Sequence, residues 1–378
     1  MMLNKINSTI KVGITGQSGF IGTHLYNNLH LNKNIEIIPF QKEYFNNIDD
    51  LKIFADKCDV IIHLAGINRH DDSDFLYKKN IELANKLIES CKTKHKKHII
   101  FSSSYQEDQN NLYGKSKQVC VELFKEWAKQ YGYFTAMKIP NVFGPFCNPN
   151  YNSVIATFCS QLIDNKNPKI IIDKELDLIY IDKLISEIDK FIFLNQNQKH
   201  LSYKVQPEYK VKVSGILKVL EQFKKMYYMN GICPNIKDSF RLNLFNTFRS
   251  YIPLSHFPFI YKKHEDSRGA FIELFQGDSP GQSSYSTTVP GITRGEHFHT
   301  RKFERFSVIK GKASIKLRKI NTDEVFEFKL DGNNPAFVDM PIWYTHNITN
   351  IGDEELITYF WINEQYNPAD PDTFYEKV

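Results

Sequence analysis

The sequence predicts two domains of different class: a doubly wound α/β domain over residues 1–250, followed by an all-β jelly-roll domain over residues 251–378. Three observations carry this prediction. A chain of 378 residues is long for one domain and sufficient for two cores. Its earlier part alternates short apolar strands with helix-length patterns, which is typical of a parallel sheet. After about Ile260 it changes to short alternating strands between turns rich in Gly, Asp and Asn, which is typical of an antiparallel barrel.

The elements of the α/β domain follow one another along the chain. The first expected strand runs from Thr9 to Thr15, and after a glycine-rich turn a helical pattern continues to Leu31. Strands and helical patterns then alternate, with strands expected at residues 35–40, 60–65, 98–102 and 134–139 and helices at residues 80–91, 113–131, 211–228 and 238–251. Strands joined through helices in this way pair in parallel.

The all-β domain begins where Pro253 and Pro258 interrupt the last helical pattern, which places the boundary near Tyr251. Its strands are short and alternate apolar with polar side chains, as expected for an antiparallel sandwich or barrel. They are expected at residues 270–275, 283–289, 306–309, 313–319, 325–330 and 355–361.

Composition excludes several function classes. Hydrophobic residues make up 42% and charged residues 24% of the chain, which is ordinary for a soluble globular protein. The net charge of +5 is scattered, so we expect no nucleic-acid partner, although an anionic small substrate would suit it. No run approaches the ~18 apolar residues of a membrane helix. The six cysteines form no CxxC pair, so we expect reduced thiols in a cytoplasmic protein.

A glycine-rich turn links the first strand to the first helix, in the segment Thr15-Gly16-Gln17-Ser18-Gly19-Phe20-Ile21-Gly22. Glycines there let the backbone approach a pyrophosphate, and the helix N-terminus supplies free N–H groups and a positive dipole. The turn therefore predicts a dinucleotide site on a Rossmann domain. The expected contacts are Gly16, Ser18, Gly19, Phe20, Ile21 and Gly22.

The end of the second strand indicates which dinucleotide binds. An acidic residue that grips a ribose hydroxyl is expected about 20 residues after the glycines. Glu36 falls within the strand instead, and the strand ends in Pro39-Phe40-Gln41-Lys42. A neutral-to-basic end favours a 2′-phosphate. We therefore expect NADP(H), with Lys42 as the contact.

Two segments predict reductase chemistry. Phe101-Ser102-Ser103-Ser104 ends a strand, and Tyr113-Gly114-Lys115-Ser116-Lys117 begins a helix. Tyr113 and Lys117 are four residues apart and therefore share one helical face. The lysine charge can lower the phenol pKa and hold the ribose, while the tyrosine passes a proton to a carbonyl oxygen. A serine hydroxyl, with Ser104 favoured over Ser102 and Ser103, would steady the same oxygen.

These residues resemble the extended short-chain dehydrogenase/reductase family over roughly residues 10–203. Further matching stretches are His63-Leu64-Ala65-Gly66, Asn80 and Pro140-Asn141-Val142-Phe143-Gly144-Pro145. Members act mainly on nucleotide sugars. The resemblance implies that Leu64, Ala65 and Pro140, together with Lys117, contact the cofactor and that Asn141 contacts the substrate.

Two departures from the family pattern bear on the reaction. Only eight residues separate Ser104 from Tyr113, fewer than in many members, so the choice among the three serines stays open. The sugar-nucleotide 4,6-dehydratases of this family have an Asp-Glu pair beside this serine, whereas Tyr105 and Gln106 follow it here. Simple ketone reduction is therefore preferred to dehydration.

A second constellation predicts a metal centre in the all-β domain. Two imidazoles one residue apart face the same side of a strand, and a carboxylate and a third imidazole follow, so the ligands expected are His297, His299, Glu304 and His346. A ligand set of three His and one carboxylate is suitable for Zn, Fe, Mn or Ni, and one Zn²⁺ is favoured if the reaction involves no redox step. The whole pattern resembles the two-part cupin motif, except that Trp343 replaces a common glycine.

The segment Asp266-Ser267-Arg268-Gly269-Ala270-Phe271-Ile272-Glu273 resembles a stretch of the nucleotide-sugar 3,5-epimerases, which are also cupins. The resemblance implies that Arg268 helps to hold the substrate diphosphate, as a bidentate guanidinium would. A surface arginine at a strand turn is the alternative.

The combination of both halves resembles a family of bifunctional capsular-polysaccharide enzymes. Stretches that match it are residues 149–158, 290–293, 344–347 and 371–373. The resemblance implies that the cupin domain epimerises C3 of a UDP-2-acetamido-2,6-dideoxy-4-hexulose and that the reductase domain then reduces C4 with NADPH. The product would be UDP-2-acetamido-2,6-dideoxy-L-talose, on the route to UDP-N-acetyl-L-fucosamine for capsule or O-antigen. A homodimer with one zinc per chain is also implied.

Three points stay open at this stage. The epimerase base is not evident, and Tyr344 and Lys302 are candidates because they flank metal ligands. The protein could instead be a monofunctional 4-keto-sugar reductase whose cupin serves dimerisation or ligand binding. An iron cupin oxygenase fused to a redox-sensing Rossmann domain is the other alternative.

Overall fold

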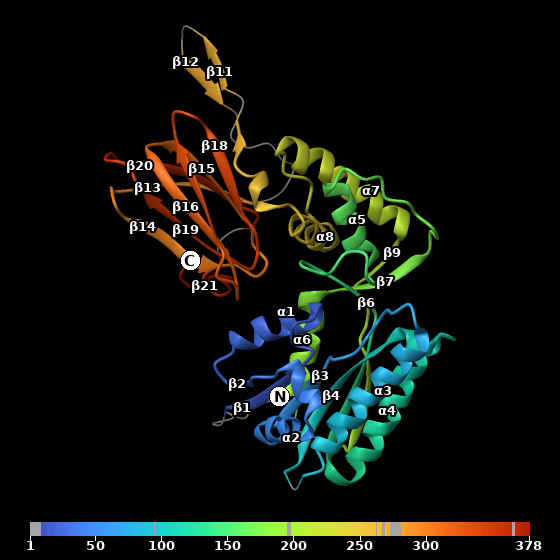
Figure 1. The fold of residues 1–378 in the computed structure, drawn as a ribbon. Helices are drawn as coiled ribbons and strands as arrows, with labels where there is room; N and C mark the ends of the chain where they lie inside the picture. The colour runs from blue at the N-terminus through green and yellow to red at the C-terminus, as the bar shows by residue number, and fades with distance from the viewer. Residues whose placement is uncertain are drawn as a thin grey trace. The chain divides into compact units, whose positions relative to one another are not determined.

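The computed structural model describes residues 9–378 except 94, 195–197, 262, 267–268, 273–280 and 365–366, and it describes the side chains of 263–266, 269–272 and 282 in no detail. The described chain forms two compact units, residues 1–157 with 170–213 and residues 158–169 with 214–378. Both appear in Figure 1, coloured along the chain.

The first unit contains a six-stranded parallel sheet in the order β2-β1-β3-β4-β5-β8. Its strands are β1 (Ile10–Thr15), β2 (Ile35–Ile38), β3 (Val60–His63), β4 (Lys97–Ser104), β5 (Gly132–Ile139) and β8 (His200–Lys204). The predicted doubly wound α/β class is confirmed.

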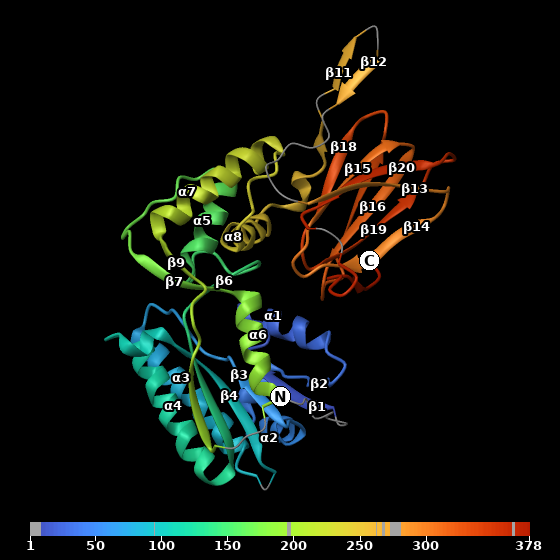
Figure 2. The same cartoon turned by 180° about the vertical axis from the view of Figure 1, so that it is seen from behind.

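Helices cover both faces of this sheet (Figures 1 and 2). In one layer α3 (Ser73–Ser90) contacts both α2 (Ile48–Lys57) and α4 (Leu112–Tyr131), while α1 (Phe20–His30) and α6 (Ile181–Ile192) contact each other in the second. The strands between the layers are buried on both faces, which is why they read as continuous apolar runs. Gly13 of β1 permits close packing of α2, since a Cβ there would lie 2.4 Å from the Phe54 ring.

A smaller sheet, which the sequence did not reveal, completes the first unit. It has the order β6-β7-β9 and consists of β6 (Asn141–Phe143), β7 (Glu175–Tyr180) and β9 (Tyr209–Lys212). The strand β6 follows β5 after Pro140, so this sheet positions the residues at the carboxyl end of β5. The helix α5 (Val154–Ile163) runs across the division between the units.

The second unit contains two five-stranded sheets, in the orders β10-β18-β15-β20-β13 and β17-β16-β19-β14-β21. All their pairings are antiparallel, which confirms the predicted jelly-roll class. The strands are β10 (Phe259–Ile260), β13 (Gln282–Thr288), β14 (Thr293–Phe298), β15 (Glu304–Lys310), β16 (Lys312–Lys319), β17 (Val325–Asp331), β18 (Ala336–Met340), β19 (Tyr344–Asn350), β20 (Leu356–Ile362) and β21 (Phe374–Tyr375). A further hairpin joins β11 (Lys263–Asp266) and β12 (Gly269–Ile272).

Two helices expected at the end of the first domain belong to the second compact unit. They are α7 (Val213–Phe223) and α8 (Ser239–Arg249). Phe245 of α8 packs on Phe303 of the barrel at a ring distance of 5.5 Å, and the Arg305 guanidinium donates to the Gly231 carbonyl at 2.8 Å. These contacts place the division between compact units near residue 213, while the boundary at residue 250 stays a prediction about the sequence domains.

Short helical turns complete the described chain: η1 (Lys42–Asn46), η2 (Tyr105–Asp108), η3 (Lys224–Tyr228) and η4 (Leu254–His256). All six cysteines are buried, and none of them forms a disulfide within the described residues. Within the described residues, no helix is both long enough and apolar enough to span a membrane.

Candidate functional site

The glycine-rich turn forms a backbone cradle at the carboxyl end of β1. Gly16 adopts a φ of +77° and lies so close to the loop after β3 that a Cβ there would be 2.7 Å from the Ala65 nitrogen. A Cβ on Gly22 would be 2.2 Å from the Gly16 carbonyl oxygen. Gly19 caps α1 without a side-chain hydrogen bond, so the first N–H groups of the helix are available for an anion.

The remaining predicted cofactor contacts gather around this cradle. Leu64 and Ala65 follow β3, and their N–H groups donate to the Thr15 carbonyl at 3.1 Å and to Thr15 Oγ1 at 3.4 Å. Ser18 is exposed, while Phe20 and Ile21 are half-buried at the start of α1. Lys42 is exposed and begins η1, four residues after β2 ends.

The predicted reductase residues meet where α4 begins. Lys117 is buried, and its Nζ donates to the Ser102 carbonyl at 2.8 Å and lies 5.7 Å from the centre of the Tyr113 ring. Burial lowers the pKa of Lys117 to about 8. Burial also raises the pKa of the Tyr113 phenol, against a smaller lowering by the Ser104 hydroxyl. At neutral pH the phenol therefore retains its proton and the lysine is largely charged.

The three serines at the end of β4 have different partners. Ser102 Oγ donates to the His63 carbonyl at 3.2 Å, and Ser103 Oγ donates to the Glu107 carboxylate. The Ser104 hydroxyl interacts with the Tyr113 phenol and accepts from the Gln106 N–H at 3.1 Å. This arrangement favours Ser104 as the serine that shares a substrate oxygen with Tyr113.

A pocket opens beside Ser104 in the first unit. It brings Ser104 together with two other predicted residues, Pro140 and Asn141, and it is also lined by Tyr105, Gln106, Gln109, Ile139 and Lys174. The Asn141 side chain is anchored on β7, since its Nδ2 donates to the Asp177 carbonyl at 3.2 Å. Sequence reasoning missed Lys174, because it lies just before β7 in no recognisable motif.

An acidic side chain that the sequence analysis passed over lies next to the serines. Glu107 of η2 accepts from Ser103 and lies 3.8 Å from Lys138 Nζ. Burial raises the pKa of its carboxyl group. Glu107 lies one residue beyond the two positions after Ser104 where dehydratases have their acidic pair, so that comparison did not point to it.

The four predicted metal ligands converge in the second unit, with their ligand atoms all within 4.8 Å of one another. His297 is on β14, His299 follows that strand, His346 is on β19, and Glu304 begins β15 of the opposite sheet. Glu304 Oε2 is 3.3 Å from His299 Nε2 and 3.1 Å from His346 Nε2. These three buried atoms have no hydrogen-bond partner within the described residues.

Three imidazoles and one carboxylate with orphaned buried atoms fit a divalent transition metal. Burial and the neighbouring imidazoles lower the pKa of His297 to about 4. Burial alone would raise the pKa of Glu304, but its contacts with His299 and His346 outweigh this and hold it below the ordinary value. A neutral His297 and an ionised Glu304 are the forms that bind metal.

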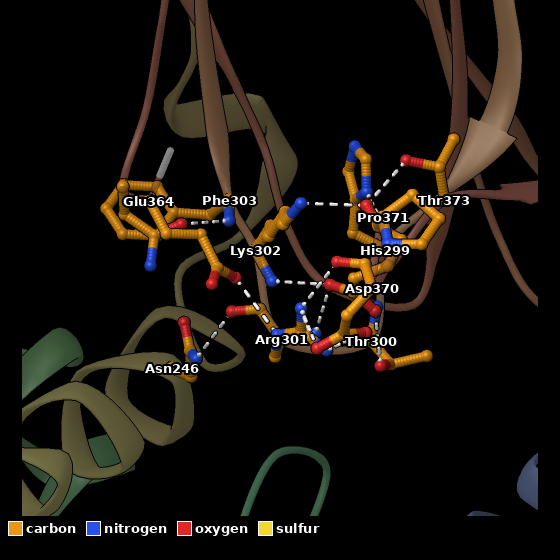
Figure 3. A network of polar contacts seen from close by, with 12 residues as sticks. Asn246, His299, Thr300, Arg301, Lys302, Phe303, Glu364, Asp370, Pro371 and Thr373 are labelled. Carbon is orange, nitrogen blue, oxygen red and sulfur yellow. Dashed lines mark hydrogen bonds and ion pairs between the residues drawn. The ribbon is translucent and has the colours of Figure 1, made fainter. Parts of the chain in front are cut away.

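The candidates for the epimerase base differ in their surroundings. Lys302 is 2% exposed, and its Nζ donates to the Pro371 carbonyl at 2.7 Å (Figure 3). Tyr344 is half-buried at the start of β19, and burial raises its pKa. Trp343 has a φ of 61°, a backbone conformation that favours glycine, which explains why glycine is common at this position of the motif. Arg268 lies outside the described residues.

Two protein-family models match the chain, one in each half. Residues 12–200 match the NAD dependent epimerase/dehydratase family, and residues 264–374 match the polysaccharide biosynthesis C-terminal domain.

Two relatives cover nearly the whole chain, and a third covers part of it. A protein of Pseudomonas aeruginosa, named UDP-2-acetamido-2,6-beta-L-arabino-hexul-4-ose reductase, is 32% identical and covers 97% of this chain and 98% of its own length. The crystal structure of the capsular polysaccharide assembling protein CapF from Staphylococcus aureus is 33% identical over 98% of this chain and 100% of that chain, with a TM-score of 0.61. A probable low-salt glycan biosynthesis epimerase of Haloferax volcanii is 28% identical over 28% of this chain and 76% of its own length.

Proposed function

Since this chain belongs to the family of CapF-like capsular polysaccharide enzymes, we propose that it reduces the C4 ketone of a UDP-linked 2-acetamido-2,6-dideoxy-hexulose. The Pseudomonas aeruginosa relative is named as a reductase of such a hexulose, which supports this substrate. The product is then UDP-2-acetamido-2,6-dideoxy-L-talose, a precursor of UDP-N-acetyl-L-fucosamine for capsule or O-antigen.

The observation that carries the reductase proposal is the grouping of Ser104, Tyr113 and Lys117 beside the pocket that contains Asn141. Tyr113 retains its proton at neutral pH and donates it to the ketone oxygen, which Ser104 holds by a second hydrogen bond. Lys117, fixed on the Ser102 carbonyl, places a positive charge near this proton transfer. Reduced nicotinamide supplies the hydride.

The glycine cradle, Leu64, Ala65 and Pro140 are the residues proposed to hold the dinucleotide. We assign NADPH as the preferred cofactor because the chain after β2 carries exposed Lys42 and no carboxylate up to that residue. The kcat/KM for NADPH should therefore exceed that for NADH, and the preference should weaken in Lys42→Ala.

A second activity, epimerisation at C3, is proposed for the barrel. A C4 ketone acidifies the C3 proton, so inversion at C3 precedes the reduction that removes this ketone. The cluster of His297, His299, Glu304 and His346 would hold Zn²⁺, which supplies Lewis acidity. The Haloferax volcanii relative, which is named as a probable epimerase, is in keeping with an epimerase activity in this chain.

The base for this step is proposed to be Tyr344, which acts in its ionised form although burial raises the pKa of its phenol. Lys302 is the weaker candidate because its ammonium group is buried and donates to a main-chain carbonyl. A homodimer with one zinc per chain completes the proposal.

One experiment tests both activities. Purified protein is incubated with the 4-keto-6-deoxy UDP-sugar in deuterated water, with and without NADPH, and the products are read by NMR and mass spectrometry. Reduction at C4 is expected only with NADPH, and deuterium at C3 is expected in both samples. Absence of NADPH oxidation with this substrate would overturn the reductase proposal.

A further inference from the structure

Near the end of the chain, the segment of residues 371–373 contacts a loop that carries a predicted metal ligand. This loop, residues 299–303, connects β14 with β15 and leads from His299 to Glu304. Figure 3 shows Pro371 and Thr373 beside it. The Pro371 carbonyl accepts from Lys302 Nζ at 2.7 Å and from Thr373 Oγ1 at 3.0 Å. The buried Lys302 side chain therefore links the loop to this segment by a hydrogen bond.

Asp372, which lies between Pro371 and Thr373, accepts several hydrogen bonds from the loop through its carboxylate. Its side chain is almost inaccessible, since the residue is 3% exposed. One carboxylate oxygen accepts from the Thr300 N–H at 3.1 Å and the Thr300 hydroxyl at 2.6 Å. The other accepts from the N–H groups of Arg301 at 3.1 Å and Lys302 at 3.0 Å. Three consecutive backbone donors converging on one carboxylate form an anion-binding concavity.

The main chain of Asp372 makes the contact that bears on the metal centre. Its carbonyl oxygen lies 2.5 Å from His299 Nδ1. The residue has a φ of 41°, a left-handed conformation that costs a non-glycine residue free energy and persists only where its surroundings hold it. The hydrogen bonds to the Asp372 carboxylate stabilise this backbone conformation. The Asp372 carbonyl is therefore directed at the His299 imidazole.

We propose that Asp372 is a positioning residue for the metal centre. Its carbonyl accepts a hydrogen bond from the Nδ1–H of His299, which fixes the imidazole as the Nδ1–H tautomer and leaves the Nε2 lone pair for the metal. The carboxylate fixes the main chain between His299 and Glu304, whose Nε2 and Oε2 atoms are 3.3 Å apart. This role rests on the metal site proposed above.

The first test compares metal affinity in matched variants of the full chain. Asp372→Asn removes the charge and places an amide N–H₂ among backbone donors, while Asp370→Asn changes an exposed neighbour that contacts Arg301 but not His299. Zn²⁺ affinity, from competition with a chromogenic chelator, should fall about 10–100-fold in Asp372→Asn and stay within about twofold of wild type in Asp370→Asn. The visible spectrum of the Co²⁺-loaded protein should change only in Asp372→Asn.

Melting of the metal-free proteins separates positioning from a purely structural role. If metal-free Asp372→Asn melts lower but the folded variant binds Zn²⁺ as tightly as wild type, Asp372 is structural and the proposal is overturned. A wild-type protein that binds neither Zn²⁺ nor Co²⁺ would overturn the metal centre together with this role.

The second test needs no variant. Long-range ¹H–¹⁵N correlations of histidine-labelled, metal-free wild-type protein report the tautomer of each neutral imidazole. We expect His299 as the Nδ1–H form once it is neutral. The Nε2–H form at His299 would overturn the proposal even if every variant failed to fold.

Discussion

Burial acts in opposite directions on two side chains that lie one helical turn apart at the start of α4. It raises the pKa of the Tyr113 phenol and lowers the pKa of Lys117 to about 8. Both shifts disfavour the charged form. A group that donates a proton at neutral pH needs to carry one, so the shift of Tyr113 suits the direction of ketone reduction.

Removal of the phenol hydroxyl tests this role. Tyr113→Phe should abolish NADPH oxidation with the 4-keto sugar, since a general acid contributes ~10²-fold or more. Its NADPH affinity, read by fluorescence titration, should stay near that of wild type because the glycine cradle and Lys117 are unchanged. A variant that retained more than about a tenth of the wild-type rate would show that Tyr113 is not the acid.

The pKa of Lys117 predicts an alkaline limb in the pH profile. The ammonium group is charged below its pKa of about 8 and neutral above it. The kcat/KM for reduction should therefore be level at lower pH and decline as pH rises through about 8. Lys117→Arg should react more slowly but lose this limb, because a guanidinium stays protonated. Lys115→Arg, an exposed neighbour, should keep the wild-type profile, and an unchanged limb in Lys117→Arg would assign it to another group.

At the scale of elements, the sequence predicted the large parallel sheet best. The apolar runs at residues 60–62 of β3 and residues 99–101 of β4 are buried on both faces of the sheet, and the glycine turn marks the first strand-to-helix connection. In contrast, β14, β18 and β19 were absent from the expected strands of the barrel. The buried positions of β19 include Thr345, His346 and Asn347, so hydrophobic alternation is lost there, and only ligand spacing pointed to this region.

The metal ligands connect elements from both sheets of the barrel. His297 and His346 belong to β14 and β19, which are hydrogen-bonded to each other, while Glu304 belongs to β15 of the other sheet. A metal held by these ligands joins the two sheets, and its binding free energy adds to that of folding.

Metal removal should therefore lower the melting temperature. Free Zn²⁺ at 100 times its Kd stabilises the native state by about 2.7 kcal/mol, a shift of several degrees that calorimetry with and without chelator would detect. His297→Ala should abolish this difference, whereas His200→Ala, an exposed histidine of the first unit, should preserve it. Equal melting of metal-loaded and metal-free wild type would exclude a stabilising metal at this site.

At the scale of the whole molecule, both sites draw on residues that are distant in sequence. Ser104, Tyr113 and the four proposed metal ligands could be predicted because their spacing follows known motifs. Lys174 beside Ser104 was not predicted. Asp372 was noted only as part of the matching stretch 371–373, and its contact with His299 was not predicted, because a long connection brings the two residues together. The helices α7 and α8 could not be assigned from sequence to the barrel unit for the same reason.

The two proposed activities make separable predictions. Epimerisation needs only the ketone, a base and an acid, because an enolate forms and is reprotonated on the other face. It needs no hydride. Tyr113→Phe without NADPH should therefore still place deuterium at C3 of the 4-keto sugar in deuterated water, as read by NMR or mass spectrometry, although it reduces nothing.

Variants of the barrel then locate the exchange and the role of the metal. His297→Ala removes a metal ligand, and Tyr344→Phe removes the proposed base. If His297→Ala loses exchange while circular dichroism shows a folded barrel, the metal stabilises the enolate, whereas loss of folding makes the metal structural. Tyr344→Phe should lose exchange and keep its metal. If wild type itself left the C3 proton in place, the epimerase proposal would fail, and a monofunctional reductase with a metal-binding barrel would be the function that stands.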